Sequence, residues 1–287
     1  MINLKEKTAF YKDKVDSYLS ALFDGLDKNG LTEAMKYSVL NGGKRLRPVL
    51  MLITCELLGV STDRALPFAC ALEIIHSSSL VHDDLPALDN DDLRRGKPSC
   101  HKKFGEAEAI LCGDALINLA YEICAENLKN QNDIECFKVL SKFSGNKGML
   151  GGQYVDITCE KKKVYSAEIL QFIQNNKTAK LLAAPLYMAS CLSGGLHKEQ
   201  LLGYGLNLGV AFQIVDDILD TVGDERLGKT VGKDLSSGKL TDIKIYGIEE
   251  SQKRAKDFTE KAISYINQEE KFSLLVEFAE DLIDRVK

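Results

Sequence analysis

The chain contains an acidic cluster whose residue types could bind a cation, the segment HDDLPALDNDD at 82–92. It follows a strongly apolar stretch, so its carboxylates are expected to emerge from a buried helix, where uncompensated charge is costly. Hard oxygen ligands at this density suit magnesium. Pro86 is expected to break the helix just after Asp84 and to bring Asp89 back beside Asp83, which an unbroken helix would place about 240° away. A solvated acidic loop that ends a helix is the alternative interpretation.

A second acidic cluster lies in the apolar helical segment FQIVDDILD at 212–220. Asp216 and Asp220 share a helical face, whereas Asp217 is turned about 100° away from Asp216. Compensation of the helix dipole does not explain these acids, because they lie toward the C-terminal end of the helix, where negative charge is disfavoured. Two carboxylate clusters on separate buried helices can face each other and hold several magnesium ions, for which a diphosphate is the natural bridging ligand.

Basic residues accompany both acidic clusters. The segment GKRLRP at 43–48 stands at a helix start, where backbone N–H groups favour an anion, and RRGK at 94–97 directly follows the first cluster. Further lysines lie mid-chain or after the second cluster: Lys177, Lys229, Lys233 and Lys239. Because arginine binds phosphate bidentately and lysine adds a point charge, the arrangement indicates two anion sites, one metal-mediated and one metal-free.

Composition restricts the function classes. The 287 residues carry 37 lysines and arginines against 42 aspartates and glutamates, a net charge of −5, so nothing global attracts the chain to nucleic acid. The sequence has no P-loop, no GxGxxG after a strand, no GxSxG and no HExxH. Its eight cysteines form no CxxC pair, which indicates a reducing compartment. The N-terminal segment lacks an apolar signal core and no apolar run reaches bilayer length, so we expect a cytoplasmic protein without stable membrane insertion.

Helical periodicity dominates the elements that must position these residues. We expect helices over 4–25, 31–41, 48–58, 64–84, 105–129, 132–147, 165–193, 198–222, 248–266 and 269–286. Pro185 should kink the helix at 165–193. No alternation of apolar and polar residues predicts strands, and no Pro/Gly/Ser-rich linker divides the chain. The expectation is one all-α domain, residues 1–287, with about ten or more helices.

The motifs together resemble the all-trans isoprenyl diphosphate synthases. The similarity rests on GGKRLRP at 42–48, on DDLPALDNDDLRRGKPSCHKKFGEAEAILCGDAL at 83–116 and on DDILD at 216–220, and it extends over most of the chain. The four-residue insert between Asp84 and Asp89 looks like the bacterial type, and the closest resemblance is to bacterial farnesyl diphosphate synthases, or geranyltranstransferases. The resemblance implies a transferase with an all-α bundle around a deep central cavity, the isoprenoid synthase fold, assembled as a homodimer.

The resemblance also implies roles for individual residues in the condensation of isopentenyl diphosphate with an allylic diphosphate. Three magnesium ions on the allylic diphosphate would be held by Asp83, Asp84, Asp89, Asp216 and Asp220. The same diphosphate would be contacted by Arg94, Lys177 and Lys229. The diphosphate of isopentenyl diphosphate would be bound without metal by Lys44, Arg47, His76 and Arg95. The allylic cation would be faced by the oxygen dipoles of Thr178 and Gln213.

Product length depends on the floor of the cavity, which the resemblance places one turn before Asp83, at Ser78 and Ser79. Similar farnesyl diphosphate synthases usually carry an aromatic residue at the first of these positions, so Ser78 opens the floor and permits a twenty-carbon product. Ile75, Ile74 and Ala71 on the next turns could close it instead. Overall resemblance favours farnesyl diphosphate, while the local residues favour geranylgeranyl diphosphate. We expect farnesyl diphosphate as the product, with geranylgeranyl diphosphate as the alternative.

Other functions fit the motifs less well. Terpene cyclases share the fold but usually replace the second aspartate motif with an Asn/Ser/Glu-type triad, whereas this chain has Asp216, Asp217 and Asp220. Non-catalytic partner subunits of heteromeric synthases typically lack one or both motifs, and both are intact here. A purely structural helical bundle gives no reason for aspartates on apolar helices.

Overall fold

The computed structural model describes residues 3–222 and 239–283, and these are almost entirely helical, which confirms the expected fold class. The chain divides into two compact units, Met1–Phe137 (unit 1) and Lys138–Lys287 (unit 2). Whether residues 1–287 form one domain is not decided by this division, and the single domain stays a prediction. No helix in the described part of the chain is both long and apolar enough to cross a membrane.

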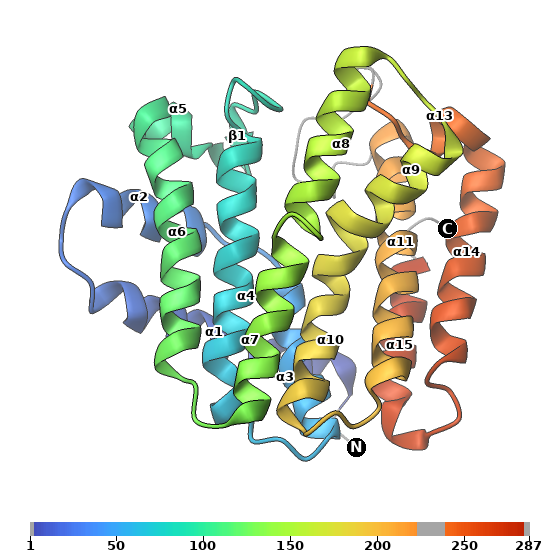
Figure 1. The fold of residues 1–287 in the computed structure, drawn as a ribbon, viewed down its shortest axis with the longest axis horizontal. Helices are drawn as coiled ribbons and strands as arrows, with labels where there is room; N and C mark the ends of the chain where they lie inside the picture. Colours follow the sequence, from blue (N-terminus) through green and yellow to red (C-terminus); the bar gives the residue numbers. More distant parts are fainter. Residues whose placement is uncertain (1–2, 223–238, 284–287) are drawn as a thin grey trace. The chain divides into compact units, whose positions relative to one another are not determined.

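Unit 1 is built around α4, whose residues are buried on most faces, as the sequence predicts. Figure 1 shows α4 running beside α6, and α3 also packs on it. The helices of the unit are α1 (Leu4–Asp24), α2 (Gly30–Leu40), α3 (Leu46–Leu57), α4 (Thr62–Asp83), α5 (Cys100–Phe104) and α6 (Glu106–Glu126). α7 (Gln131–Ser144) begins in unit 1 and ends in unit 2.

A short hairpin after α4 was not expected from the sequence. Strand β1 (Leu93–Arg94) pairs antiparallel with β2 (Lys97–Pro98). Arg95 and Gly96 form the two-residue turn with φ of 55° and 76°, which is the backbone conformation that right-twisted hairpins favour. The ladder has only two residues per strand, so alternation of polar and apolar residues was too short to reveal it.

In unit 2, several helices pack against α11. Figure 1 shows α11 between α10 and α14. The elements are α8 (Met149–Lys162), α9 (Ala167–Ile173), the π-helix η1 (Gln174–Ala179), α10 (Lys180–Leu192), α11 (Lys198–Val222), α13 (Asp242–Tyr246), α14 (Ile248–Ser264), the 3₁₀ turn η3 (Glu270–Phe272) and α15 (Ser273–Ile283).

Two expectations for unit 2 were wrong. The helix α8 was missed, because its Gly-rich start and polar end give little apolar periodicity. The single helix expected over 165–193 is instead interrupted by η1, in which the N–H of Lys180 donates to the carbonyl of Asn175, five residues back. Pro185 lies inside the helix Lys180–Leu192, and the kink expected there stays a prediction. A widened turn of this kind depends on packing, so periodicity alone could not predict it.

A buried guanidinium joins three segments of unit 1. Arg45, only 3% exposed, has a left-handed backbone with φ of 51° and turns its side chain inward. It donates to Asp16 over 2.7 Å, to Glu73 over 3.0 Å and to the carbonyl of Val39 over 2.8 Å. Burial opposes its charge, but Glu73 and Asp16 outweigh burial and raise the pKa of Arg45. The pairs tie α1 and α4 to the start of α3.

We expect Arg45→Ala to destabilise the protein by about 3–5 kcal/mol, because it leaves the carboxylate of Glu73, 2% exposed, without its buried partner. Urea denaturation followed by circular dichroism measures the change. Lys36→Ala is the matched control: it removes the exposed pair with Asp24 and should cost less than about 1 kcal/mol. Equal losses in the two variants would contradict a stabilising role for the buried pair.

Candidate active site

The first acidic cluster forms a compact loop at the end of α4. The helix ends at Asp83, with Asp84 at its C-cap. The chain then folds back, so that the N–H of Asp89 donates to the carbonyl of Asp83 over 2.8 Å and the N–H of Asp91 donates to that of Asp84 over 3.1 Å. The predicted break and the return of Asp89 to Asp83 are therefore confirmed for the backbone.

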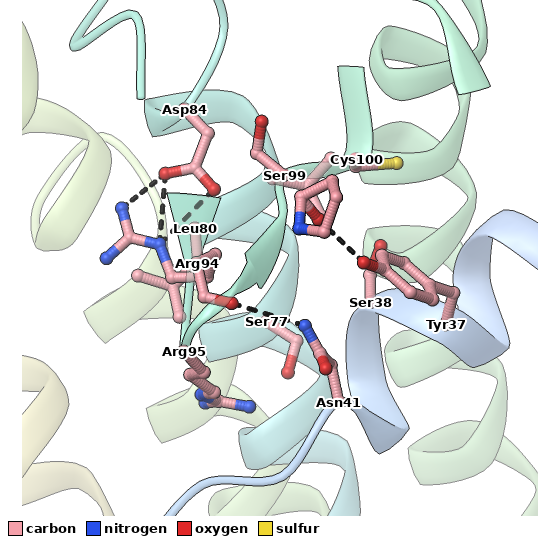
Figure 2. A pocket seen from close by; sticks show the side chains of 12 residues that line it. Tyr37, Ser38, Asn41, Ser77, Leu80, Asp84, Arg94, Arg95, Ser99 and Cys100 are labelled. Atoms are coloured by element: carbon pink, nitrogen blue, oxygen red, sulfur yellow. Dashed lines mark hydrogen bonds and ion pairs between the residues drawn. The ribbon is translucent and has the colours of Figure 1, made fainter. Parts of the chain in front are cut away.

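Arg94 is paired with this loop rather than turned to solvent. Its Nε donates to Asp84 over 3.0 Å, and one terminal nitrogen donates to Asp91 over 3.3 Å. Figure 2 shows the guanidinium facing the carboxylate of Asp84. Burial raises the pKa of Asp84, the charges of Asp91 and Asp89 add to that effect, and Arg94 opposes it. Burial and the neighbouring carboxylates thus oppose the charge of Asp84 even beside Arg94, so a further cation at this loop would favour its ionised form.

The hairpin that carries Arg94 is anchored to α2. The side-chain amide of Asn41 donates to the carbonyl of Arg94 over 3.3 Å, and the hydroxyl of Tyr37 donates to the carbonyl of Pro98 over 2.7 Å. These side chains line a small pocket (Figure 2). Asp91 and the anchors were not among the predicted site residues, and only the position of Asp91 within the acidic run pointed to it.

Arg95 belongs to a separate basic group. Its side chain points away from Asp84 (Figure 2) and donates to the carbonyl of Gly42. Gly43 has φ of 114°, and a Cβ on it would lie 2.7 Å from the guanidinium carbon of Arg95. Any other residue at 43 would therefore be strained and would displace Arg95. Burial, together with nearby Arg45 and Arg94, lowers the pKa of Arg95.

His76 lies on α4, is partly buried, and is affected by the charges of four arginines. Burial lowers the pKa of His76 well below its ordinary value, and the charges of Arg47, Arg95, Arg94 and Arg45 lower it further. The imidazole is therefore neutral at neutral pH, while the guanidinium groups around it are cationic. An anion brought to this group would relieve the repulsion among them.

Other residues singled out in unit 1 lie nearby in the chain but differ in exposure. Lys44 is exposed, and Arg47 is partly buried. Ser78 is 1% exposed, and its hydroxyl donates to the carbonyl of Ile75 over 2.8 Å. Ser79 is partly buried and donates to the carbonyl of His76 over 2.8 Å. Because both hydroxyls are engaged by the helix backbone, these serines act as small side chains rather than as donors to a ligand.

In unit 2 the π-helix presents Lys177 and Thr178. Lys177 donates to Asp156 of α8 over 2.5 Å. Asp156 is 8% exposed, so the pair is largely shielded from water. Sequence reasoning missed Asp156, because it lies on the helix that periodicity did not predict. The two predicted residues are thus placed by an element, η1, of a type often found at functional sites.

The second acidic cluster lies at the C-terminal end of α11, as expected. Asp216 is partly buried and Asp220 is 1% exposed, and their spacing puts both on one face of the helix. Gln213 meets Thr178, whose hydroxyl donates to its Oε1 over 2.6 Å. The structure therefore brings together the two residues that were assigned to the allylic cation. Lys229 and Lys233 lie outside the described residues.

The number and type of oxygen ligands in the acidic groups decide whether magnesium can bind to them. Within residues 3–222 and 239–283, no three His, Cys, Asp or Glu side chains form a ready cation cage. Magnesium does not need one, because it usually binds one or two carboxylates and completes its shell with water and substrate oxygens. The carboxylate of Asp84, whose pKa burial raises, and those of Asp216 and Asp220 on one helix face offer ligands of that kind.

Comparison with known proteins gives consistent matches. The family model "Polyprenyl synthetase" matches residues 28–279. A geranylgeranyl diphosphate synthase of Cyanophora paradoxa is 45% identical over 236 residues, which are 80% of this chain and 79% of that protein. A dimethylallyltranstransferase of Fischerella ambigua (strain UTEX 1903) is 41% identical over 290 residues, 99% of this chain and 84% of that protein. A geranyltransferase structure from Helicobacter pylori, complexed with magnesium and isoprenyl diphosphate, has a TM-score of 0.82 and 31% identity, covering 97% and 96% of the two chains.

The low pKa of His76 predicts how stability depends on pH. Below pH about 6.5 the unfolded chain protonates this histidine while the folded chain does not, so the free energy of unfolding should fall as pH is lowered. His76→Gln removes the group and should flatten the profile between about pH 7 and pH 5.5. Urea denaturation at several pH values measures it. Parallel profiles for the two proteins would contradict a neutral His76.

Proposed function

Since the chain belongs to the polyprenyl synthetase family, we propose that it condenses isopentenyl diphosphate with allylic diphosphates as a short-chain all-trans prenyltransferase. The observation that carries the proposal is the pair of adjoining groups in unit 1. A loop of carboxylates, in which burial and like charges oppose the ionisation of Asp84, adjoins a group of arginines whose charges act on a neutral histidine. Such a pair suits two diphosphates, one bound through magnesium and one bound directly.

In this mechanism the aspartates bind the metal ions and the basic residues bind diphosphate oxygens. Asp83, Asp84 and Asp89, with Asp216 and Asp220, would hold magnesium, three ions by family resemblance. When bound, magnesium neutralises the diphosphate as the allylic C–O bond breaks and the electron pair leaves with oxygen. Arg94 would exchange its partners Asp84 and Asp91 for diphosphate oxygens, and both carboxylates would then be freed for a stronger cation. Lys177, now paired with Asp156, and Lys229 would contact the same diphosphate.

Isopentenyl diphosphate would be held by Lys44, Arg47, His76 and Arg95. A neutral His76 can donate one N–H to a phosphate oxygen and would become protonated more easily beside the dianionic group. The double bond of isopentenyl diphosphate then attacks the allylic cation, a C–C bond forms, and the proton lost from the adduct passes to the departed diphosphate. Thr178 and Gln213 would stabilise the cation with their oxygen dipoles.

For the product, two observations favour geranylgeranyl diphosphate over the farnesyl diphosphate that overall resemblance favours. Ser78 and Ser79 are small, and their hydroxyls are occupied by the backbone of α4, so neither would present a bulky or a free polar group to an apolar tail. Curated relatives above 40% identity include several proteins named geranylgeranyl diphosphate or pyrophosphate synthase. We therefore propose a twenty-carbon product, with the fifteen-carbon product as the alternative.

Assembly and location are part of the same proposal. A homodimer and a single domain over residues 1–287 follow from the family resemblance. A cytoplasmic location is supported by the eight cysteines, all of them free and buried.

The reaction is tested by incubating purified protein with magnesium, labelled isopentenyl diphosphate and dimethylallyl, geranyl or farnesyl diphosphate. We expect a linear, acid-labile prenyl diphosphate. Asp83→Asn should reduce kcat at least ~100-fold, because a metal-ligand oxygen is lost. Asp63→Asn, at the exposed start of the same helix, is the control and should leave kcat unchanged. A cyclic hydrocarbon would indicate a cyclase, and no turnover would favour a partner subunit or a structural protein.

Product length is tested by Ser78→Tyr. The larger side chain should close the floor and shorten the main product from twenty carbons to fifteen or ten, as measured by chromatography of the dephosphorylated prenyl alcohols. Ser78→Ala keeps the small volume and removes only the hydroxyl that donates to Ile75, so its product should stay as in the unaltered protein. An unchanged product length in Ser78→Tyr would rule out a floor at this position.

A further inference from the structure

A series of hydrogen bonds in unit 2 connects the Thr178–Gln213 pair to Asp217, the middle aspartate of the second cluster. Nε2 of Gln213 donates to Oδ1 of Asp217 over 2.8 Å. The other carboxylate oxygen of Asp217, Oδ2, accepts the backbone N–H of Asp242 over 2.9 Å. Asp217 is only 5% exposed, so both interactions are shielded from water. Each of its oxygens thus faces an N–H donor within the protein.

This arrangement fixes the direction of the bonds that follow. An ionised carboxylate can only accept, so the amide of Gln213 must turn its NH₂ group to Asp217 and its oxygen to Thr178. The hydroxyl of Thr178 must then donate its hydrogen to that oxygen over 2.6 Å. Only oxygen lone pairs of Thr178 and Gln213 then remain to interact with another group, because the hydroxyl hydrogen of Thr178 is already donated to Gln213.

We propose that Asp217 is a positioning residue rather than a metal ligand: it sets the direction of these hydrogen bonds so that Thr178 and Gln213 present oxygen lone pairs to the allylic cation. The inference rests on the proposed function, because it concerns groups that face the cation in that reaction. On α11, Asp216 and Asp220 lie about 40° apart, and Asp217 lies about 100° from Asp216 and about 60° from Asp220. Because both oxygens of Asp217 accept from N–H groups of the protein, we assign Asp216 and Asp220 as the metal ligands and Asp217 as the positioning group.

Backbone contacts hold the pair at its short distance. Gly209 lies one turn before Gln213 on α11, and a Cβ on it would lie 2.4 Å from the Cα of Ala179, the residue after Thr178. The absence of a side chain therefore lets α11 approach the π-helix closely enough for Thr178 and Gln213 to bond. Close packing of two backbones leaves little freedom for either side chain to reorient.

The far end of the series is also held firmly. The buried carboxylate of Asp242, which is 0% exposed, accepts from Gln174, the first residue of the π-helix, over 3.0 Å, and from Arg254 of α14 over 3.1 Å. The N–H that Asp242 donates to Asp217 is therefore fixed by side-chain contacts to two other elements. Asp217 is thus oriented by its surroundings and in turn orients Gln213.

Asp217→Asn changes the direction of the hydrogen bonds without changing the packing, because asparagine has the same shape as aspartate. Its Oδ1 can still accept from Asp242, and its Nδ2 then faces Gln213 as a donor. The amide of Gln213 must turn over, present NH₂ to Thr178 and release the hydroxyl hydrogen. The groups of this series remain hydrogen-bonded, but the released hydroxyl hydrogen of Thr178 can now face the allylic cation and repel its positive charge. The variant should fold with nearly unchanged thermal stability and lose activity.

We expect Asp217→Asn to lower kcat ~100-fold, the size of effect seen when one preorganised electrostatic group is lost. KM for both substrates and the magnesium concentration for half-maximal rate should stay within about threefold, because no ligand of either is removed. Asp216→Asn should instead raise the magnesium requirement. A raised requirement in Asp217→Asn as well would identify Asp217 as a metal ligand and overturn the inference.

A double-mutant cycle tests whether Asp217 acts through Thr178. If it does, Asp217→Asn combined with Thr178→Val should be no slower than Thr178→Val alone, within about threefold. Multiplicative losses would show independent roles and overturn the inference. Tyr204→Phe is the control, since it removes a buried hydrogen bond from α11 to the carbonyl of Leu275 outside this series, and kcat should stay within about threefold although stability falls. A ~100-fold loss in that control would attribute the effect to packing and overturn the inference.

The unaltered protein, assayed in parallel, distinguishes the two levels of the proposal. If it forms no prenyl diphosphate, the proposed function fails and the role of Asp217 fails with it. If it is active while Asp217→Asn is equally fast, the prenyltransferase assignment stands and the role of Asp217 alone is overturned.

Discussion

Charge removed from water must be compensated by a partner within the protein, and this constraint organises both units. Arg45 and Glu73 form such a pair between the start of α3 and α4, and Asp242 and Arg254 form one between α13 and α14. Each member alone would be costly to bury, so each pair constrains which helices can pack together. In unit 2 the second pair also reaches the candidate site, because the backbone N–H of Asp242 donates to Asp217.

Asp84 also has a partner of opposite charge, Arg94, but this partner does not fully offset the effect of burial. Burial and two neighbouring carboxylates keep the pKa of Asp84 raised although Arg94 lies beside it. A raised pKa means that the ionised form costs free energy here, and a further cation would lower that cost. In the proposed reaction both members leave one another for ligands of opposite charge. A site that binds magnesium diphosphate can therefore remain folded without it, because each group serves as the other's partner.

Neighbouring charges determine the protonation or orientation of the neutral groups in the site. His76 is kept neutral by burial and by the arginines near it, so an arriving anion changes its protonation as well as its contacts. Gln213 has no charge, yet the carboxylate of Asp217 decides which end of its amide faces Thr178. Electrostatic preorganisation in this protein thus depends on residues behind those that would touch the substrate.

The sequence by itself determined what local geometry controls. Helical periodicity predicted most helices, spacing put Asp216 and Asp220 on one face, and Pro86 predicted the fold-back of the acidic loop, because these follow from the period of the helix and from proline's fixed φ. Only the tertiary structure decided that Arg45 points inward, that a π-helix carries Thr178, and that Asp217 bonds to Gln213. Those outcomes depend on which helices approach one another and on which donor meets which acceptor, and a linear pattern of residue types carries neither.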